Sequence, residues 1–168
     1  MKSIKIRLEF NNKQTTLANK HVGVARYAYN WGKSVCDNAI QNKEKRPTAI
    51  DLHKKFVAEE KQTKDWLYDV SKCSPQQALR NLYGAYKRTF KVKGTKCPRY
   101  KKKGQHDSFY LEGNIITDGN KIKVPIFGWL KCSEILPECQ IKNVVISKKA
   151  SHWFIAFKIP FEPQICPK

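Results

Sequence analysis

The sequence predicts an α+β fold in which a β-barrel or strongly bent sheet is interrupted by a helical insertion. Residues 4–10 alternate between apolar and charged side chains, the pattern of a half-buried strand. Across residues 15–91, apolar side chains recur at three- and four-residue steps, as they do in helices. Beyond Gly94 the alternation returns. One strand therefore precedes a helical block of about 80 residues and the other strands follow it, within a 168-residue chain that suits one domain with an insertion.

The first helix is predicted from Thr15 to Ile40, with its apolar positions on one stripe. This helix contains Arg26-Tyr27-Ala28-Tyr29-Asn30. We expect Tyr27 and Trp31 to pack against the core, and Arg26 and Asn30 to support the fold rather than contact bases.

A second helix is predicted after a charged break at residues 42–47. Thr48 followed by Asp51 resembles a capping box, in which each residue satisfies a backbone N–H of the other. Leu52 and Phe56 then share one face. A short element follows around residues 66–68.

A third helix is predicted from Ser74 to about Lys91. Ser74 is suited to cap it, Pro75 fits the first turn because its missing N–H costs nothing there, and Gln77 is placed to reach back to the cap. Gly84, inside this helix, indicates a close approach by another helix.

At least four further strands are predicted after this helix. Phe109 and Leu111 share one face, and Asp118-Gly119 is a hairpin signal before residues 121–124. The remaining strands are predicted around Trp129, at residues 141–146 and at residues 153–159.

Composition favours a polyanionic partner. The chain has 33 Lys and Arg against 14 Asp and Glu, a net charge of +19, which repels itself unless a polyanion neutralises it. It has no 18-residue apolar run and no apolar secretory segment, so we expect no membrane span and a cytoplasmic location. We interpret the six cysteines as free thiols, since none lies in a C-x-x-C pair and the cytosol is reducing: Cys36, Cys73, Cys97, Cys132, Cys139 and Cys166. No cofactor or metal site is expected.

The strongest candidate site is the segment 87–103, called here the basic segment, with nine cations in seventeen residues and no acid. Cations neutralise phosphates and aromatic rings offer stacking platforms for unpaired bases, so we favour nucleic acid over a solvated linker. The predicted backbone contacts are Lys87, Arg88, Lys91, Lys93, Lys96, Arg99, Lys101, Lys102 and Lys103.

The start of the third helix is a second candidate site. Helix N-termini present free N–H groups to phosphate, and Gln and Arg side chains pair with adenine and guanine in a major groove. The residues are Lys72, Cys73, Gln76, Gln77 and Arg80. From these residues alone, a capped surface helix is the favoured interpretation.

Enzyme signatures are weak. The four histidines are scattered, and the sequence contains no H-E-x-x-H, G-x-S-x-G, Walker A or G-x-G-x-x-G motif. Asp107, Glu112 and Asp118 suggest a metal-dependent nuclease as an alternative. Because Asp118 belongs to a turn and Glu112 precedes Gly113, we interpret them as loop residues and predict no catalytic residue.

The chain resembles the OrfB/TnpB transposon proteins, RNA-guided nucleases related to type V CRISPR effectors. The segments that carry the resemblance, in order, are residues 23–30 (GVARYAYN), 77–82 (QALRNL), 85–90 (AYKRTF), 98–103 (PRYKKK), 107–109 (DSF), 124–125 (VP) and 128–129 (GW). Each is weak alone, but their ordered set covers nearly the whole chain.

This resemblance implies an oligonucleotide-binding-like wedge barrel split by a helical recognition insertion. Its parts would be the first wedge strand at 1–11, the insertion at 12–95, the rest of the wedge at 96–163 and a tail at 164–168. It also implies guide RNA and double-stranded DNA as partners, with a short target-adjacent DNA motif read by Thr48, Lys72, Cys73, Gln76, Gln77 and Arg80. We expect Tyr100 and Phe109 to stack on bases.

The resemblance also implies that the chain binds without cutting. Full-length relatives continue into a RuvC-like nuclease and a zinc ribbon, neither of which follows here, so we expect a natural truncation, a decayed copy or a deliberately shortened chain. A separate nuclease or a full-length relative would then be a further partner. The alternatives are a truncated DNA-binding repressor, the metal-dependent nuclease above, and an inactive remnant that folds poorly.

Overall fold

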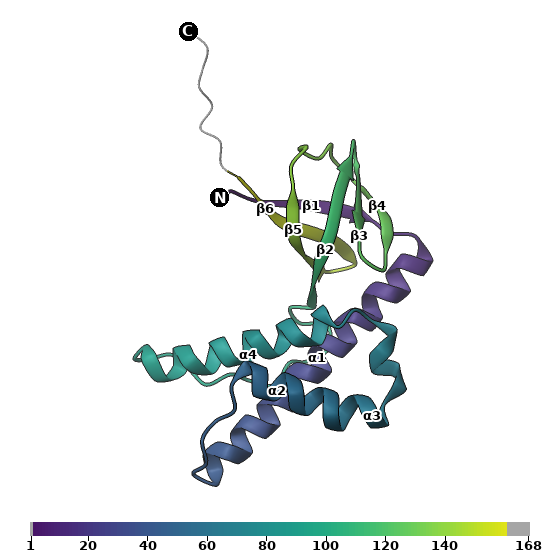
Figure 1. Cartoon of the computed structure of the whole chain (residues 1–168). Coiled ribbons are helices and arrows are strands. Elements are labelled where there is room, and N and C mark those ends of the chain that lie inside the picture. The colour runs from purple at the N-terminus through teal and green to yellow at the C-terminus, as the bar shows by residue number, and fades with distance from the viewer. Residues whose placement is uncertain (1, 161–168) are drawn as a thin grey trace.

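The computed structural model describes residues 2–160, and its strands form a closed barrel (Figure 1). The strands are β1 (Lys2–Glu9), β2 (Ser108–Asp118), β3 (Lys121–Val124), β4 (Gly128–Cys132), β5 (Ile141–Lys149) and β6 (His152–Ile159). Their order around the barrel is β1-β4-β3-β2-β5-β6, and every pairing is antiparallel. The predicted α+β class, with a barrel interrupted by helices, is confirmed.

Strand β1 closes the barrel although it lies about a hundred residues before β2 in the chain. It pairs with β4 on one side and β6 on the other. Its alternation is the predicted one, since Ile6 and Leu8 are only 3% and 4% exposed while Arg7 faces solvent. The single N-terminal strand therefore contributes directly to the barrel core.

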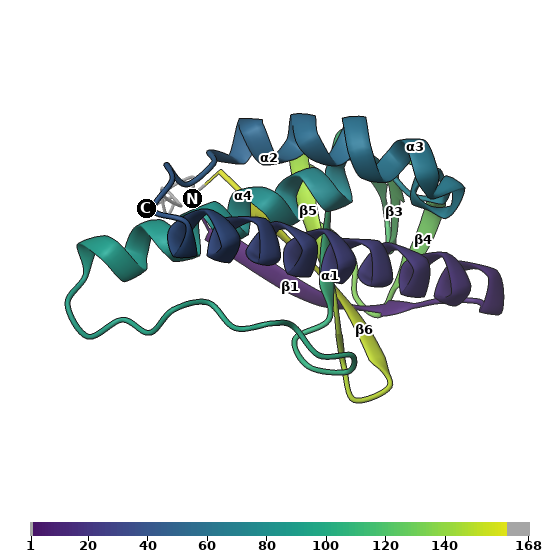
Figure 2. The same cartoon turned by 90° about the horizontal axis from the view of Figure 1, so that it is seen from below.

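The helical insertion lies against one end of the barrel (Figure 1). It comprises α1 (Asn12–Gln41), α2 (Ala49–Lys55), a π-helical turn η1 (Phe56–Glu60), α3 (Lys61–Thr63), a 3₁₀ turn η2 (Asp65–Asp69) and α4 (Cys73–Lys91). Seen from below, α1 and α4 lie side by side and α2 packs beside α4 (Figure 2).

Two of the predicted helix starts were wrong in position. Helix α1 begins three residues before Thr15, because the Asn11 side chain accepts a hydrogen bond from the Gln14 N–H (2.8 Å) and the Gln14 side-chain oxygen accepts one from the Asn11 N–H (3.1 Å). Helix α4 begins at Cys73, and Ser74 does not cap it: the Ser74 hydroxyl donates instead to the His21 carbonyl (3.2 Å).

The other details of α4 also differ from the expectation. Gln77 does not reach back, since its amide donates to Asn81 at 3.0 Å. Gly84 makes no close approach: a Cβ there would meet nothing within 4 Å. The close approach occurs at Gly32 on α1, where a Cβ would lie 2.7 Å from Leu79 and 2.8 Å from Leu82.

The start of the second helix is confirmed. The Thr48 hydroxyl accepts from the Asp51 N–H at 3.2 Å, and the Asp51 carboxylate accepts from the Thr48 N–H at 3.1 Å. Leu52 and Phe56 are both fully buried, and Phe56 packs edge-on against Trp31. This cap fixes the start of α2 at Ala49.

The irregular and turn segments are partly as predicted. The Asp118-Gly119 hairpin is confirmed, with Gly119 at φ +61° between β2 and β3. Regular β-structure resumes at Ser108 rather than soon after Gly94.

Five cysteines are free, namely Cys36, Cys73, Cys97, Cys132 and Cys139, whereas Cys166 and the tail 164–168 lie outside the described residues. None of the helices in residues 2–160 is long and apolar enough to cross a membrane.

His21 connects the helices to the barrel. Its ring is fully buried and packs against Phe109 and Phe127, with centroids 4.9 and 5.0 Å away. Nε2 accepts from the Ser71 N–H (3.1 Å), and Nδ1 lies 2.8 Å from the Leu17 carbonyl. Because Nε2 must accept, the proton is on Nδ1 and the ring is neutral.

We expect acid to destabilise the protein partly through His21. Burial lowers the pKa of His21 below its ordinary value of 6.5, outweighing the carbonyl contact that raises it. Stability from the neutral ring is therefore fully present above pH 6.5 and falls below it, by up to about 1.4 kcal/mol per pH unit. Urea unfolding between pH 7.5 and 5.5 should show a smaller pH dependence for His21→Gln than for wild type. Exposed His152→Gln is the control, and equal slopes in all three proteins would contradict the assignment.

Candidate nucleic-acid interface

The solvent-facing side of α4 carries polar and cationic side chains along its whole length. Lys72, Gln76, Arg80, Lys87 and Lys91 are spaced by four or seven residues, so they share one helix face. All are exposed except Gln76, which is half-buried. The opposite side packs against α1 through residues such as Leu79, Leu82 and Tyr86. The exposed side of α4 thus carries cations from its start to its end without an acidic residue, with the exposed Phe90 ring among them.

The part of the basic segment that follows α4, residues 92–103, turns back and runs beside α1 (Figure 2). Two contacts hold it. The Thr89 hydroxyl lies 3.1 Å from the Lys96 carbonyl, and the Asn30 amide exchanges two hydrogen bonds with the backbone of Lys101, at 2.8 and 3.0 Å. Asn30 therefore supports the fold, as predicted. The cations of this segment are displayed on a path fixed to α1 rather than on a free linker.

Eight of the nine predicted backbone contacts are exposed, and Lys101 is the exception. The exposed eight are Lys87, Arg88, Lys91, Lys93, Lys96, Arg99, Lys102 and Lys103. Lys101 lies over the Tyr29 ring, 4.5 Å from its centroid, and burial lowers the pKa of its ammonium although Asp107 opposes this. We assign Lys101 to holding the segment in place rather than to contacting phosphate.

The two predicted stacking residues lie in different surroundings. Tyr100 is 53% exposed, and the Lys33 ammonium lies 4.7 Å from its ring centroid. Phe109 is 3% exposed and stacks on Phe127 inside the barrel, with ring centroids 5.7 Å apart. The expectation for Phe109 was wrong because its place on β2 points its side chain into the core. Tyr100 has a ring face available to a base.

The predicted motif-reading residues are only partly accessible. Lys72 and Arg80 are exposed, and Gln76 has no side-chain hydrogen bond among the described residues. Cys73 is buried, with its thiol 3.9 Å from the Glu112 carboxylate, so it does not face a DNA groove. The side chains of Thr48 and Gln77 are engaged in the cap and with Asn81, as described above.

The three carboxylates of the alternative nuclease are not brought together. Asp107 precedes β2 and faces Arg26 at 3.6 Å, Glu112 accepts from Tyr110, and Asp118 ends β2 at the far end of the strand. Within residues 2–160, no group of three acidic, histidine or cysteine side chains is arranged to hold a metal ion. The metal-dependent nuclease has no supporting geometry here.

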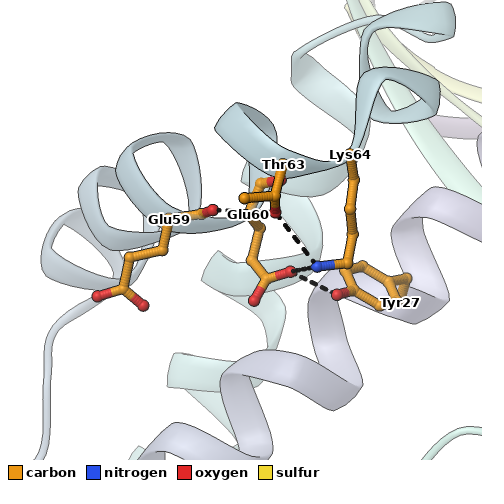
Figure 3. A network of polar contacts seen from close by, with 5 residues as sticks. All are labelled: Tyr27, Glu59, Glu60, Thr63 and Lys64. Carbon is orange, nitrogen blue, oxygen red and sulfur yellow. Dashed lines mark hydrogen bonds and ion pairs between the residues drawn. The ribbon is translucent and has the colours of Figure 1, made fainter.

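A polar network that sequence reasoning missed joins α1 to the segment around α3 (Figure 3). The Tyr27 hydroxyl donates to a Glu60 carboxylate oxygen at 2.5 Å, and the Lys64 ammonium lies 2.7 Å from the same oxygen. These two contacts, Lys64 first, lower the pKa of Glu60. Tyr27 and Glu60 are 33 residues apart, so no local pattern pairs them.

An open groove of about 460 Å³ lies beside this network on α1. Gly23 and Val24 line it on α1, Trp66 forms a wall, and its charged residues are Lys20, Arg26 and Asp69. Trp66 is 45% exposed and meets Tyr27 edge-on. The groove adds an exposed aromatic surface to the insertion.

Two comparisons with known proteins relate this chain to a described family and to a curated protein. Residues 1–45, which contain β1, α1 and the turn after it, match the family model HTH_OrfB_IS605, described as a helix-turn-helix domain. Over 100 residues the chain is 32% identical to "Putative RNA-guided DNA endonuclease InsQ" of Escherichia coli (strain K12), an alignment that covers 58% of this chain and 25% of that protein. The chain thus spans about a quarter of this curated relative. Both findings confirm the resemblance to the OrfB/TnpB proteins.

Proposed function

We propose that this chain is a nucleic-acid-binding module of an OrfB/TnpB-type protein, which holds a guide RNA and approaches a short motif in duplex DNA. The observation that carries the proposal is the cationic face of α4, continued by the basic segment fixed along α1. Such an array neutralises successive phosphates and releases their counterions, which favours binding to any polynucleotide.

The two ends of this array suit different tasks. At the start of α4, Gln76 lies between Lys72 and Arg80, so a polar side chain with free donors is flanked by cations. This arrangement suits a helix that enters a major groove, with phosphates fixing its position and Gln76 contacting a base edge. The far end of α4 and the basic segment, with the exposed Tyr100 ring, suit an RNA strand.

The direct test is to purify the chain from its host and sequence the RNA that copurifies. Recovery of one discrete transcript supports a guide-binding module, and bulk ribosomal fragments contradict it. Fluorescence anisotropy with RNA and duplex DNA, over a range of salt concentrations, then measures the affinity and its salt dependence. Absence of binding to both polymers at low salt would refute the proposal.

Gln76→Ala should reduce sequence discrimination rather than general affinity. Loss of a bidentate contact to a base edge costs about 1–3 kcal/mol at the preferred motif and little elsewhere. Competition binding of randomised duplexes followed by sequencing would show one or two positions at which the preference is lost. Gln77→Ala is the matched control, because Gln77 is bound to Asn81. Equal losses on scrambled DNA would show that Gln76 only supports the helix.

We also propose that the chain binds nucleic acid without cleaving it, because its carboxylates at Asp107, Glu112 and Asp118 lie apart. Incubation with Mg²⁺ and labelled duplex tests this proposal. Steady cleavage that is lost in Asp107→Ala would contradict it.

A further inference from the structure

Four basic side chains gather between α2, α3 and the start of α4, and we call them the Lys61 cluster: His53, Lys61, Lys72 and Arg80. None of them takes part in an ion pair between described residues. The positive charges of Lys61, Arg80 and Lys72 all act on His53, and Lys72 acts on Lys61. The cluster therefore repels itself in the free protein.

Lys61 is the most unusual member. It is 8% exposed, and its ammonium has no carboxylate partner, only the ring of Tyr68 at 5.1 Å. Burial, followed by the charge of Lys72, lowers the pKa of Lys61. Lys33 is buried to a similar degree, but it is paired with Asp37. Lys61 Nζ is not among the buried polar atoms without a partner, so the ammonium reaches solvent although most of the side chain is buried, and an anion from outside would neutralise it there.

His53 provides a second, independent observation. Its Nδ1 is buried and has no hydrogen-bond partner among the described residues. Burial first, and then the three neighbouring cations, lower the pKa of the ring. A bound anion would oppose both effects, since it favours the protonated imidazole and accepts a hydrogen bond from it.

Lys64 shows that the lack of a carboxylate partner is specific to Lys61 and not shared by the neighbouring lysine. It lies three residues after Lys61, yet its ammonium is 2.7 Å from Glu60 and that hydrogen bond raises its pKa (Figure 3). One lysine of this short segment is therefore neutralised within the protein and the other is left for an outside group.

We propose that the Lys61 cluster is a binding site for one phosphate group of the DNA backbone. The cluster opens to solvent through Lys72 and Arg80, which flank Gln76 on α4, so a DNA strand met by that face would carry a phosphate over Lys61 and His53. The inference rests on the proposed function, and it adds a defined phosphate position beside the base-reading helix. Phosphate suits the site because it presents several acceptor oxygens to separate donors.

Lys61→Gln and Lys64→Gln, compared in the full chain, test the inference. Lys61→Gln should lower duplex affinity about eightfold at 0.1 M salt and reduce the slope of log K against log salt by about 0.9, the effect of one phosphate contact. It should leave the melting temperature almost unchanged, because the Lys61 ammonium has no carboxylate partner among the described residues. Lys64→Gln should lower the melting temperature and leave the salt slope unchanged. Equal salt slopes in the two variants would overturn the inference.

The source of the phosphate is distinguished by NMR of the histidine ring protons. Duplex DNA should shift the His53 resonances and raise its pKa in wild type but not in Lys61→Gln. Inorganic phosphate at millimolar concentration should shift the same resonances and be displaced by duplex. A response to inorganic phosphate alone, or to RNA and not to duplex, would overturn the DNA assignment. If wild type binds no polynucleotide but inorganic phosphate still shifts His53, the proposed function fails while the phosphate site stands.

Discussion

Replacing Lys87, Lys91, Lys102 and Lys103 together with Gln should weaken nucleic-acid binding by about three orders of magnitude at 0.1 M salt. All four are exposed on the α4 face or the basic segment, and each phosphate contact contributes about 0.9 to the salt slope for duplex DNA, or about 0.7 for a single strand. The loss should be similar for all sequences, because backbone contacts carry no sequence information. Affinity measured from 50 to 300 mM salt gives both the loss and the change in slope.

The chain offers a control with the same change in net charge. Lys2, Lys121, Lys142 and Lys158 are exposed at the end of the barrel away from the helices, at the start of β1, β3 and β5 and the end of β6. Their replacement by Gln should change the affinity less than tenfold. If both quadruple variants lose affinity equally, net charge and not the α4 face determines binding.

Lys101 must be treated separately from Lys102 and Lys103, although the sequence presents the three as equivalent. Its backbone is held by Asn30 and its ammonium lies over Tyr29, so Lys101→Ala would disturb the path of the segment as well as its charge. A variant that changes Lys101, Lys102 and Lys103 together would combine the loss of charge with a disturbed path of the segment. The four positions chosen above avoid this problem.

The order of strands and helices along the chain was predictable because it depends on the spacing of apolar side chains, a signal to which many residues of each element contribute. Alternation in residues 4–10 and the helical repeat after them placed β1 before the insertion, whereas its antiparallel pairing with β4 and β6 joins segments more than a hundred residues apart and has no local signal. The positions of helix ends depend on single side chains. Ser74 has the sequence of a cap, but in the folded chain the His21 carbonyl, 53 residues away, takes its hydroxyl.

The candidate site was predictable as a charge run and not as individual roles. A run of cations is identified by composition alone, and eight of its nine members are indeed exposed. Which aromatic ring is accessible depends on the surroundings that the fold gives it: Tyr100 is exposed, whereas Phe109 on β2 is buried in the core. The contrast between Lys61 and Lys64 depends on which of them Glu60 reaches. No local pattern distinguishes those two lysines.

Gly84 shows the same limitation of local sequence patterns. A glycine within a helix indicates either a close approach or a position of no consequence, and the sequence does not say which. In the folded chain a Cβ at Gly32 would lie 2.7 Å from Leu79 and 2.8 Å from Leu82, both fully buried, whereas a Cβ at Gly84 meets nothing within 4 Å. The α1–α4 contact therefore depends on Gly32.

Gly32→Val should destabilise the protein by about 2–3 kcal/mol, because the branched side chain forces Leu79 and Leu82 out of a packed core. Gly84→Val makes the same change in a second helix, so the gain in helix propensity is shared and only the packing differs. For a chain of this size the expected fall in melting temperature is about 4–12 °C for Gly32→Val, with almost none for Gly84→Val. Calorimetry of both variants checks this, and equal melting temperatures would mean that α1 and α4 do not pack as described. Since α1 also carries Asn30, which holds the basic segment, Gly32→Val should in addition weaken nucleic-acid binding near its melting temperature.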